Sequence, residues 1–209
     1  GAMPANGLFY APSDQCFCYP GVKVSGFMAM ATLPKETPPT VASTDDALER
    51  GPLYGIKFEA IAITPGDWPM HRKNEQRSGS TSISVPAELE QAWEVNFACP
   101  ATQPVVVGDK LWTVEKDEHR IVCLNAVDGS GLWSFTAGGR IDSSPTISRG
   151  RVLFGCRDGY VYCLNANDGL LIWKFRAAPC DQRLVSYGQV ESVWPVHGSI
   201  LVQDNVAYF

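Results

Sequence analysis

Seven cysteines and three histidines are the residues of this 209-residue chain that most readily do chemistry. Cys16 and Cys18 form a C-x-C pair in the Pro-flanked stretch SDQCFCYPG. This spacing differs from the C-x-x-C-H of haem attachment, and no matching Cys or His pair completes a zinc site. Cys16 and Cys18 are therefore candidate redox thiols, with a disulfide to Cys99 or Cys180 as the alternative.

A second candidate group lies between residues 179 and 197. PCDQRLVSYGQVE contains Cys180, Arg183 and Tyr187, and His197 follows in VWPVHGS. Of the three histidines, His197 alone has an apolar and potentially enclosed setting, as a general base requires. Two hypotheses follow: an enzyme such as a hydrolase that uses this loop, or a structural histidine in a chain that is not an enzyme.

A sequence motif that occurs twice lies between these candidate residues. CLNAVDGSGLWSF (123–135) and CLNANDGLLIWKF (163–175) carry Cys, Leu, Asn, Ala, Asp, Gly, Trp and Phe at identical places. Trp93, Trp133 and Trp173 follow one another at intervals of 40 residues, which indicates a repeat architecture. We expect each tryptophan to pack flat against the neighbouring repeat, and the repeated cysteine to be a small buried residue.

Within each repeat the apolar pattern has a period of two and is broken by turn residues. Residues 144–175 contain four short strands, SPTIS, RVLFGC, YVYCLNA and LLIWKF, separated by Arg-Gly and Asp-Gly turns. Tight hairpins need a positive φ, which glycine provides at the repeat positions Gly129, Gly159 and Gly169. Four antiparallel strands per repeat describe a propeller blade. The predicted fold class is all-β, with β-propeller blades of four antiparallel strands and an incomplete ring in this chain.

Composition changes along the chain divide it into seven expected segments. They are 1–3, a tag-cleavage scar; 4–31, a partial blade with the C-x-C loop; 32–66, a Pro- and Thr-rich linker followed by a strand over 53–63; 67–86, an extended lead-in; 87–138 and 139–178, two propeller blades; and 179–209, an insertion and the first half of a further blade.

Charge and hydropathy exclude two classes of partner. The formal net charge is −5, from 17 basic and 22 acidic residues, so no basic face for nucleic acid is expected. No apolar run approaches the ~20 residues that span a bilayer, so we expect no membrane span. No export signal is visible, and the cysteines alone do not fix the compartment.

DGYVYCLNANDGLLIWKF (158–175) resembles the pyrroloquinoline-quinone-type (PQQ-like) repeat, with its Gly-x-Val-Tyr strand, Leu-x-Ala, Asp/Asn-Gly and Trp. The likeness extends over residues 87–178, and residues 67–79 resemble the lead-in before such a propeller. NGLFYAPSDQCFCYPGVKVSGFMAM resembles a segment of large PQQ-like proteins of planctomycete-type bacteria. The resemblance implies a bacterial β-propeller protein in the periplasm or another extracytoplasmic compartment.

The PQQ-like family includes quinoprotein dehydrogenases, which bind PQQ and calcium, as well as barrel-assembly lipoproteins and many proteins that bind no quinone. The dehydrogenases resembled here have a vicinal Cys-Cys pair and a catalytic Asp with Glu and Asn calcium ligands. This chain has no Cys-Cys dipeptide, and Asp128, Asp158 and Asp168 occupy turn positions. We expect no cofactor and a non-catalytic binding or scaffold module; the alternative is a fragment of a PQQ- and calcium-dependent dehydrogenase.

Two repeats and part of a third cannot close a propeller, which needs about four blades or more. Open strand edges invite pairing. The expected partners are therefore other copies of the chain or the remainder of a longer propeller, together with a protein or glycan ligand.

Overall fold

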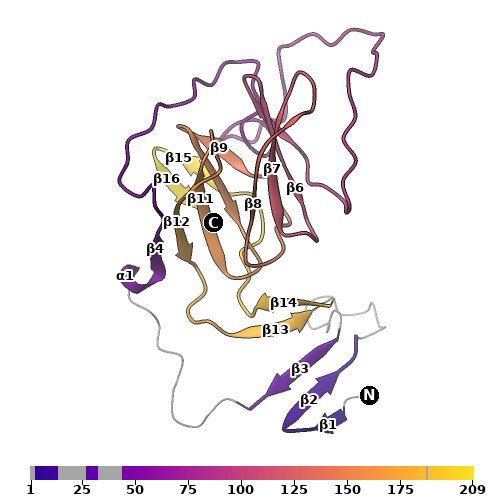
Figure 1. Cartoon of the computed structure of the whole chain (residues 1–209), viewed down its shortest axis with the longest axis vertical. Coiled ribbons are helices and arrows are strands. Elements are labelled where there is room, and N and C mark those ends of the chain that lie inside the picture. Colours follow the sequence, from indigo (N-terminus) through magenta and orange to yellow (C-terminus); the bar gives the residue numbers. More distant parts are fainter. Residues whose placement is uncertain (1–2, 14–26, 33–43, 187) are drawn as a thin grey trace.

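The computed structural model describes residues 3–13, 27–32, 44–186 and 188–209 of the chain. The described part is all-β apart from one four-residue helix, as the sequence predicted. Two four-stranded antiparallel blades form its centre, with a two-stranded half-blade beside them and two smaller sheets below (Figure 1). None of the described helices has the length and apolar character of a membrane span.

The two central blades have the same construction. Blade one consists of β5 (Val105–Val107), β6 (Lys110–Glu115), β7 (Arg120–Asn125) and β8 (Gly131–Thr136). Blade two consists of β9 (Thr146–Ser148), β10 (Arg151–Gly155), β11 (Tyr160–Asn165) and β12 (Leu171–Arg176). Each blade is a meander, and the register shifts at the same repeat position, after Cys123 and after Cys163. The four strands predicted for the second repeat are confirmed.

One predicted strand is wrong. Residues 53–63 form no strand; instead β4 (Leu48–Arg50), directly after helix α1 (Thr44–Ala47), pairs with the outer edge of β12. Gly51 lies so close to the backbone of Leu171 that a Cβ would sit 2.2 Å from its carbonyl oxygen. The chain then turns, with Tyr54 N–H donating to Gly51 O, so the alternating apolar residues that follow do not pair in a ladder.

A continuous core joins the two blades. Its largest fully buried side chains include Trp112, Ile121, Phe154 and Leu164. Cys123 and Cys163 are completely buried, and this burial raises the pKa of each thiol to about 12. The repeated cysteine is therefore the small buried residue that the sequence predicted, and a thiol with so high a pKa is a poor nucleophile.

Two of the repeat tryptophans, Trp93 and Trp133, reach the turn of the next blade. The Trp93 indole N–H donates to Ala126 O at 3.1 Å, and the Trp133 N–H donates to Ala166 O at the same distance. A Cβ added to the following turn glycine would lie 2.7 Å from the Trp93 ring at Gly129 and 2.5 Å from the Trp133 ring at Gly169. The rings therefore lie flat on glycine backbone, which confirms the predicted packing between blades for these two tryptophans. We call this contact the tryptophan clamp.

The lead-in closes the inner edges of both blades. Trp68 and Val106 of β5 exchange backbone hydrogen bonds, and Ile147 N–H of β9 donates to Pro69 O. Asp67 is buried and accepts N–H groups from Gly108 at 2.9 Å and from Thr64 at 2.6 Å. Burial alone would raise the pKa of Asp67, but these two N–H groups lower it below its usual value. The four residues DWPM thus replace the strand pairing that each inner edge lacks.

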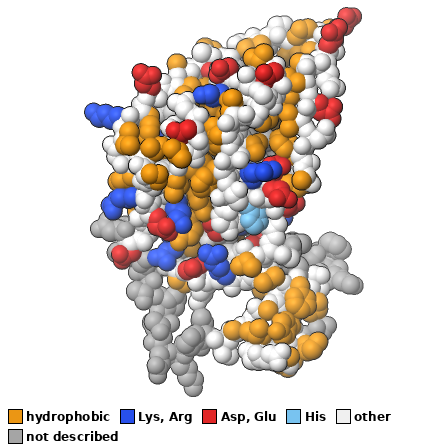
Figure 2. All heavy atoms as spheres, viewed as in Figure 1, with side chains coloured by type: hydrophobic (Ala, Val, Ile, Leu, Met, Phe, Trp, Pro, Cys, Tyr) orange, Lys and Arg blue, Asp and Glu red, His pale blue; other side chains and the backbone are white. Residues whose placement is uncertain are grey.

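Three smaller sheets complete the described chain. The half-blade is β15 (Leu201–Gln203) paired with β16 (Val206–Tyr208), and the insertion forms the hairpin of β13 (Arg183–Ser186) and β14 (Gln189–Ser192). The N-terminal sheet has the order β1 (Met3–Ala5), β2 (Leu8–Ala11) and β3 (Met28–Ala31), and it lies beside β13. Figure 2 shows hydrophobic side chains gathered over this sheet.

Candidate functional site

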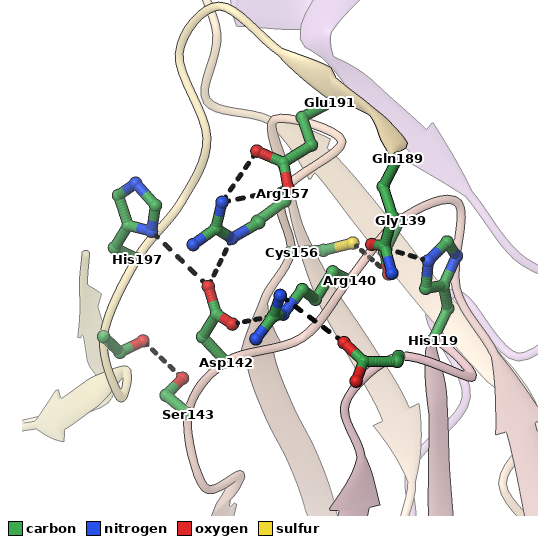
Figure 3. Close-up of polar contacts among 12 residues, drawn as sticks. His119, Gly139, Arg140, Asp142, Ser143, Cys156, Arg157, Gln189, Glu191 and His197 are labelled. Atoms are coloured by element: carbon green, nitrogen blue, oxygen red, sulfur yellow. Dashed lines mark hydrogen bonds and ion pairs between the residues drawn. The ribbon is translucent and has the colours of Figure 1, made fainter. Parts of the chain in front are cut away.

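A network of charged side chains lies where the loop after β8, the turn between β10 and β11, and hairpin β13–β14 meet (Figure 3). Arg157, in the β10–β11 turn, is at its centre. Its Nη1 donates to both carboxylate oxygens of Glu191, at 2.9 and 2.7 Å, and its Nε donates to Asp142. The guanidinium therefore holds the hairpin to blade two through charged hydrogen bonds, which are stronger than neutral ones.

Asp142 is shared between two arginines. Its second oxygen lies 2.8 Å from Arg140 Nε in an ion pair, while Arg140 Nη1 lies 3.4 Å from Asp117. Burial alone would raise the pKa of Asp142, but the hydrogen bond and charge of Arg157 and the charge of Arg140 lower it below its usual value. Asp142 is thus a charged structural link, whereas a general base needs a pKa near the working pH.

The network buries two polar residues of strand β14, while three apolar side chains on or just after this strand stay in solvent. Glu191 is only 4% exposed, and its neighbour Ser192 is buried as well. Val190, Val193 and Trp194 are 53%, 41% and 39% exposed. This arrangement reverses the usual preference, in which apolar residues are inside and Glu is almost never buried without a partner. We call Val190, Val193 and Trp194 the insertion patch.

A polar pocket of about 370 Å³ opens beside Asp142, at the start of the inner strands. The lead-in lines it with His71 and Arg77, and the β6–β7 turn adds Lys116. Two of its hydroxyl groups have backbone partners, since Ser143 Oγ donates to Gly198 O at 2.7 Å and Ser144 Oγ donates to Gln103 O at 2.6 Å.

The structure separates the site residues that the sequence had grouped. His197 is the member of the group that reaches the network, with Nδ1 3.8 Å from Asp142, but its side chain is 57% exposed. The prediction of an enclosed, apolar setting was wrong: Val196 packs against the core, but the next residue, His197, points out into solvent. Arg183 pairs with Asp181 at 2.9 Å on the surface.

Of the candidate cysteines, the structure describes Cys99 and Cys180. Cys180 and Cys99 are partly exposed free thiols. Cys16, Cys18 and Tyr187 lie outside the described residues, so their proposed roles stay predictions. Among the residues that the structure describes, no ion pair or hydrogen bond connects Cys180 or Arg183 to His197.

Sequence reasoning missed the residues that build the network. Arg157 and Asp158 both lie in the RDG turn, whose composition indicated only a hairpin. Asp158 is nevertheless buried and accepts the Tyr162 hydroxyl at 2.5 Å as well as Tyr160 N–H at 3.0 Å. By contrast, Asp128 and Asp168 are exposed and cap their own turns, as predicted. No local signal marked Glu191, because it lies in the mostly polar strand β14, QVES.

The described residues do not fit the metal of a quinoprotein. Within them, no group of three or more His, Cys, Asp and Glu side chains is placed to hold a metal ion. Two buried or partly buried acidic side chains already have partners. Asp142 pairs with two arginines, and Asp67 accepts hydrogen bonds from two backbone N–H groups.

The blades, their tryptophan clamps and the turn chemistry define a segment of a β-propeller built from PQQ-like repeats. Residues 84–205 match the family model described as outer membrane protein assembly factor BamB. The match covers more than half of the chain, so the chain belongs to this family. Among curated proteins, none matches it.

Two solved structures, both of quinohemoprotein alcohol dehydrogenases, agree on the fold. The chain is similar to a quinohemoprotein alcohol dehydrogenase from Pseudomonas putida HK5 (TM-score 0.55, 16% identity) and to one from Comamonas testosteroni (0.52, 15%), over 68% and 70% of its length. It spans 22% and 23% of those two proteins. BamB from Moraxella catarrhalis matches 54% of this chain over 35% of its own length, with a TM-score of 0.41 and 21% identity.

Proposed function

We propose that the chain is a non-catalytic binding module of a PQQ-like propeller, and that it binds a protein partner through the insertion patch. The observation that supports this most is the inverted burial of hairpin β13–β14, with Glu191 inside and Val190 and Trp194 outside. Exposed apolar groups beside a charged rim are typical of protein-binding surfaces.

The ion pairs around the patch support binding rather than catalysis. Arg157 and Glu191 satisfy each other, so they fix the orientation of the hairpin before any partner arrives. A preorganised surface loses less conformational entropy on binding. Trp is also among the residues that most often dominate interface energetics. Two of the three side chains of the patch are valines, and such an aliphatic surface offers no hydrogen bonds to sugar hydroxyls, which favours a protein partner over a glycan.

The proposed module acts without PQQ or calcium. This part of the proposal is supported by the lack of a suitable metal-ligand group in the described chain and by the lead-in, which pairs with the inner edges of β5 and β9. We further propose an extracytoplasmic location, because the family is described by a factor for outer membrane protein assembly.

Site-specific photocrosslinking tests the proposal. A photoreactive phenylalanine analogue replaces Trp194 in the source cells, and a matched variant carries it at Val127, which is exposed on a turn of blade one. We expect a single protein adduct of constant mass from position 194 and none from position 127. Equal adducts from both positions, or no adduct at 194 in folded protein, would contradict partner binding through the patch.

A further inference from the structure

We propose that the polar pocket beside Asp142 takes a carboxylate side chain of the protein that the insertion patch binds, so that this partner presents an acidic residue next to its apolar contact. The inference rests on the proposed function, because it names the chemistry of that partner. Arg77 and Lys116 supply the positive charge of this carboxylate site, and His71 adds a ring nitrogen that can donate a hydrogen bond.

The two cations of the pocket have no acidic partner within the described part of the chain. Neither Arg77 nor Lys116 takes part in an ion pair there. Among the described residues that line the pocket, Asp142 is the only acid, and Arg140 and Arg157 already match its charge. A pocket with two unmatched cations attracts an anion, even in a chain whose formal net charge is −5.

The loop that carries Arg77 is fixed in shape by its own hydrogen bonds. Asn74 Nδ2 donates to Ser78 Oγ at 2.8 Å, and Ser78 N–H donates to Asn74 Oδ1 at 3.0 Å. The Arg77 N–H donates to Asn74 O at 2.8 Å, with Arg77 at a φ of +52°, which is uncommon for a residue other than glycine. Its Nη2 donates to Ser199 O, at 3.3 Å, on the pocket wall. Uncommon backbone conformations of this kind cluster at binding sites, and here one directs the guanidinium to the pocket.

The pocket lies within reach of a partner that covers the insertion patch. Gly198 lines the pocket and follows Trp194 by four residues, so their Cα atoms are at most ~15 Å apart. Asp142 lines the pocket as well, and Arg157 connects it to Glu191 of the hairpin (Figure 3). An extended peptide covers this distance with about five residues. One short segment of the partner can therefore contact both the patch and the pocket.

The chemistry of the pocket selects a carboxylate among the groups that a protein presents. The acidic side chains of an unmodified protein are Asp and Glu, and their oxygens accept charged hydrogen bonds from arginine and lysine. A pocket of about 370 Å³ has room for one such side chain together with water. A phosphorylated residue would use the same donors, so the test has to separate phosphate from carboxylate.

Titration with two small anions at constant ionic strength tests the site without a partner. We expect succinate to shift the backbone NMR signals of Arg77, Lys116 and Ser143 saturably, and Arg77→Gln/Lys116→Gln to lose these shifts. The control Lys57→Gln/Arg72→Gln, which removes two exposed cations outside the pocket, should keep them. No saturable shift up to about 100 mM succinate, or binding of inorganic phosphate at least ~10-fold tighter than that of succinate, would overturn the carboxylate site.

Photocrosslinking from position 194 tests whether the partner supplies the carboxylate. At limiting concentration of the chain, Arg77→Gln/Lys116→Gln should give at least ~10-fold less adduct at an unchanged thermal midpoint, because charged hydrogen bonds to the partner are lost. Lys116→Gln alone, which leaves the lead-in loop intact, should also reduce the adduct, whereas Lys57→Gln/Arg72→Gln should not. Equal adduct from all these proteins would overturn this inference and leave the proposed function standing. The absence of any adduct, even without these substitutions, would overturn both.

Discussion

The contact between a tryptophan and a turn glycine is the smallest unit from which this molecule is built. Gly169 combines a φ of +74° with the Trp133 ring directly against its Cα, so two separate constraints select glycine. The duplicated cysteine, in contrast, is a buried residue without reactive character. The repeated residues of this chain therefore have structural roles in the blades. The candidate site is built from residues that are not repeated, Asp142, Arg157 and Glu191.

Gly169→Val should destabilise the chain by at least ~2 kcal/mol, because valine meets both the positive φ and the Trp133 ring. Gly131→Ala is the matched control, since a Cβ at Gly131 would have no atom within 4 Å. Denaturant unfolding measures both variants. Similar stabilities would show that the clamp does not hold the blades together.

The lowered pKa of Asp142 predicts that the folded chain loses stability in acid. Its pKa is lower in the folded chain than its ordinary value of 3.8, so it contributes stability above that value. This contribution is lost as the pH falls through the lower, folded pKa. Asp142→Asn should reduce stability at pH 7 and flatten its decline below about pH 4. Unfolding measured from pH 7 to pH 2 checks this, with Asp181→Asn as the surface control; a steeper decline in Asp142→Asn would contradict it.

At the scale of elements, the strands of both blades followed from period-two patterns and Asp-Gly turns. Residues 53–63, which were predicted to be a strand but form none, also alternate between apolar and polar residues, so alternation alone does not identify a strand. Whether an alternating segment becomes a strand depends on an available edge, and β4 had already taken the edge of β12. The network was equally hidden, because Arg157 and Glu191 are 34 residues apart and meet only after hairpin β13–β14 folds back.

The Arg157–Glu191 pair should control the hairpin and little else. Arg157→Ala leaves a buried carboxylate unpaired, so residues 183–192 should exchange their amide hydrogens at least ~10-fold faster. The amides of β10 and β11 should keep their protection. Arg183→Ala, which removes an exposed pair with Asp181, is the control and should change neither region. Equal loss of protection in hairpin and blade would show that Arg157 supports the whole fold.

At the scale of the molecule, the lead-in connects the two blades, because it pairs with the free inner edges of β5 and β9. Its composition indicated only an extended segment, and no local pattern could show that DWPM pairs with two inner strands. Asp67 holds this segment to the β5–β6 turn.

Asp67→Ala should leave the N–H of Gly108 without its acceptor and reduce stability by about 1–3 kcal/mol. Trypsin should then cut faster after Arg72, Lys73 and Arg77. Glu75→Ala, at an exposed acid of the same segment, is the control. Unchanged cleavage in Asp67→Ala would mean that Asp67 does not hold the lead-in in place.

The central claim is that the insertion patch binds a partner and does not stabilise the chain. The most direct measurement compares the amount of partner captured by Val190→Ser/Trp194→Ser with that captured by the unchanged chain, at equal concentrations of folded protein. We predict an unchanged thermal midpoint and at least ~10-fold less captured partner, because the contact lies in these two side chains. Undiminished capture together with a lowered midpoint would contradict the claim, since Val190 and Trp194 would then be structural.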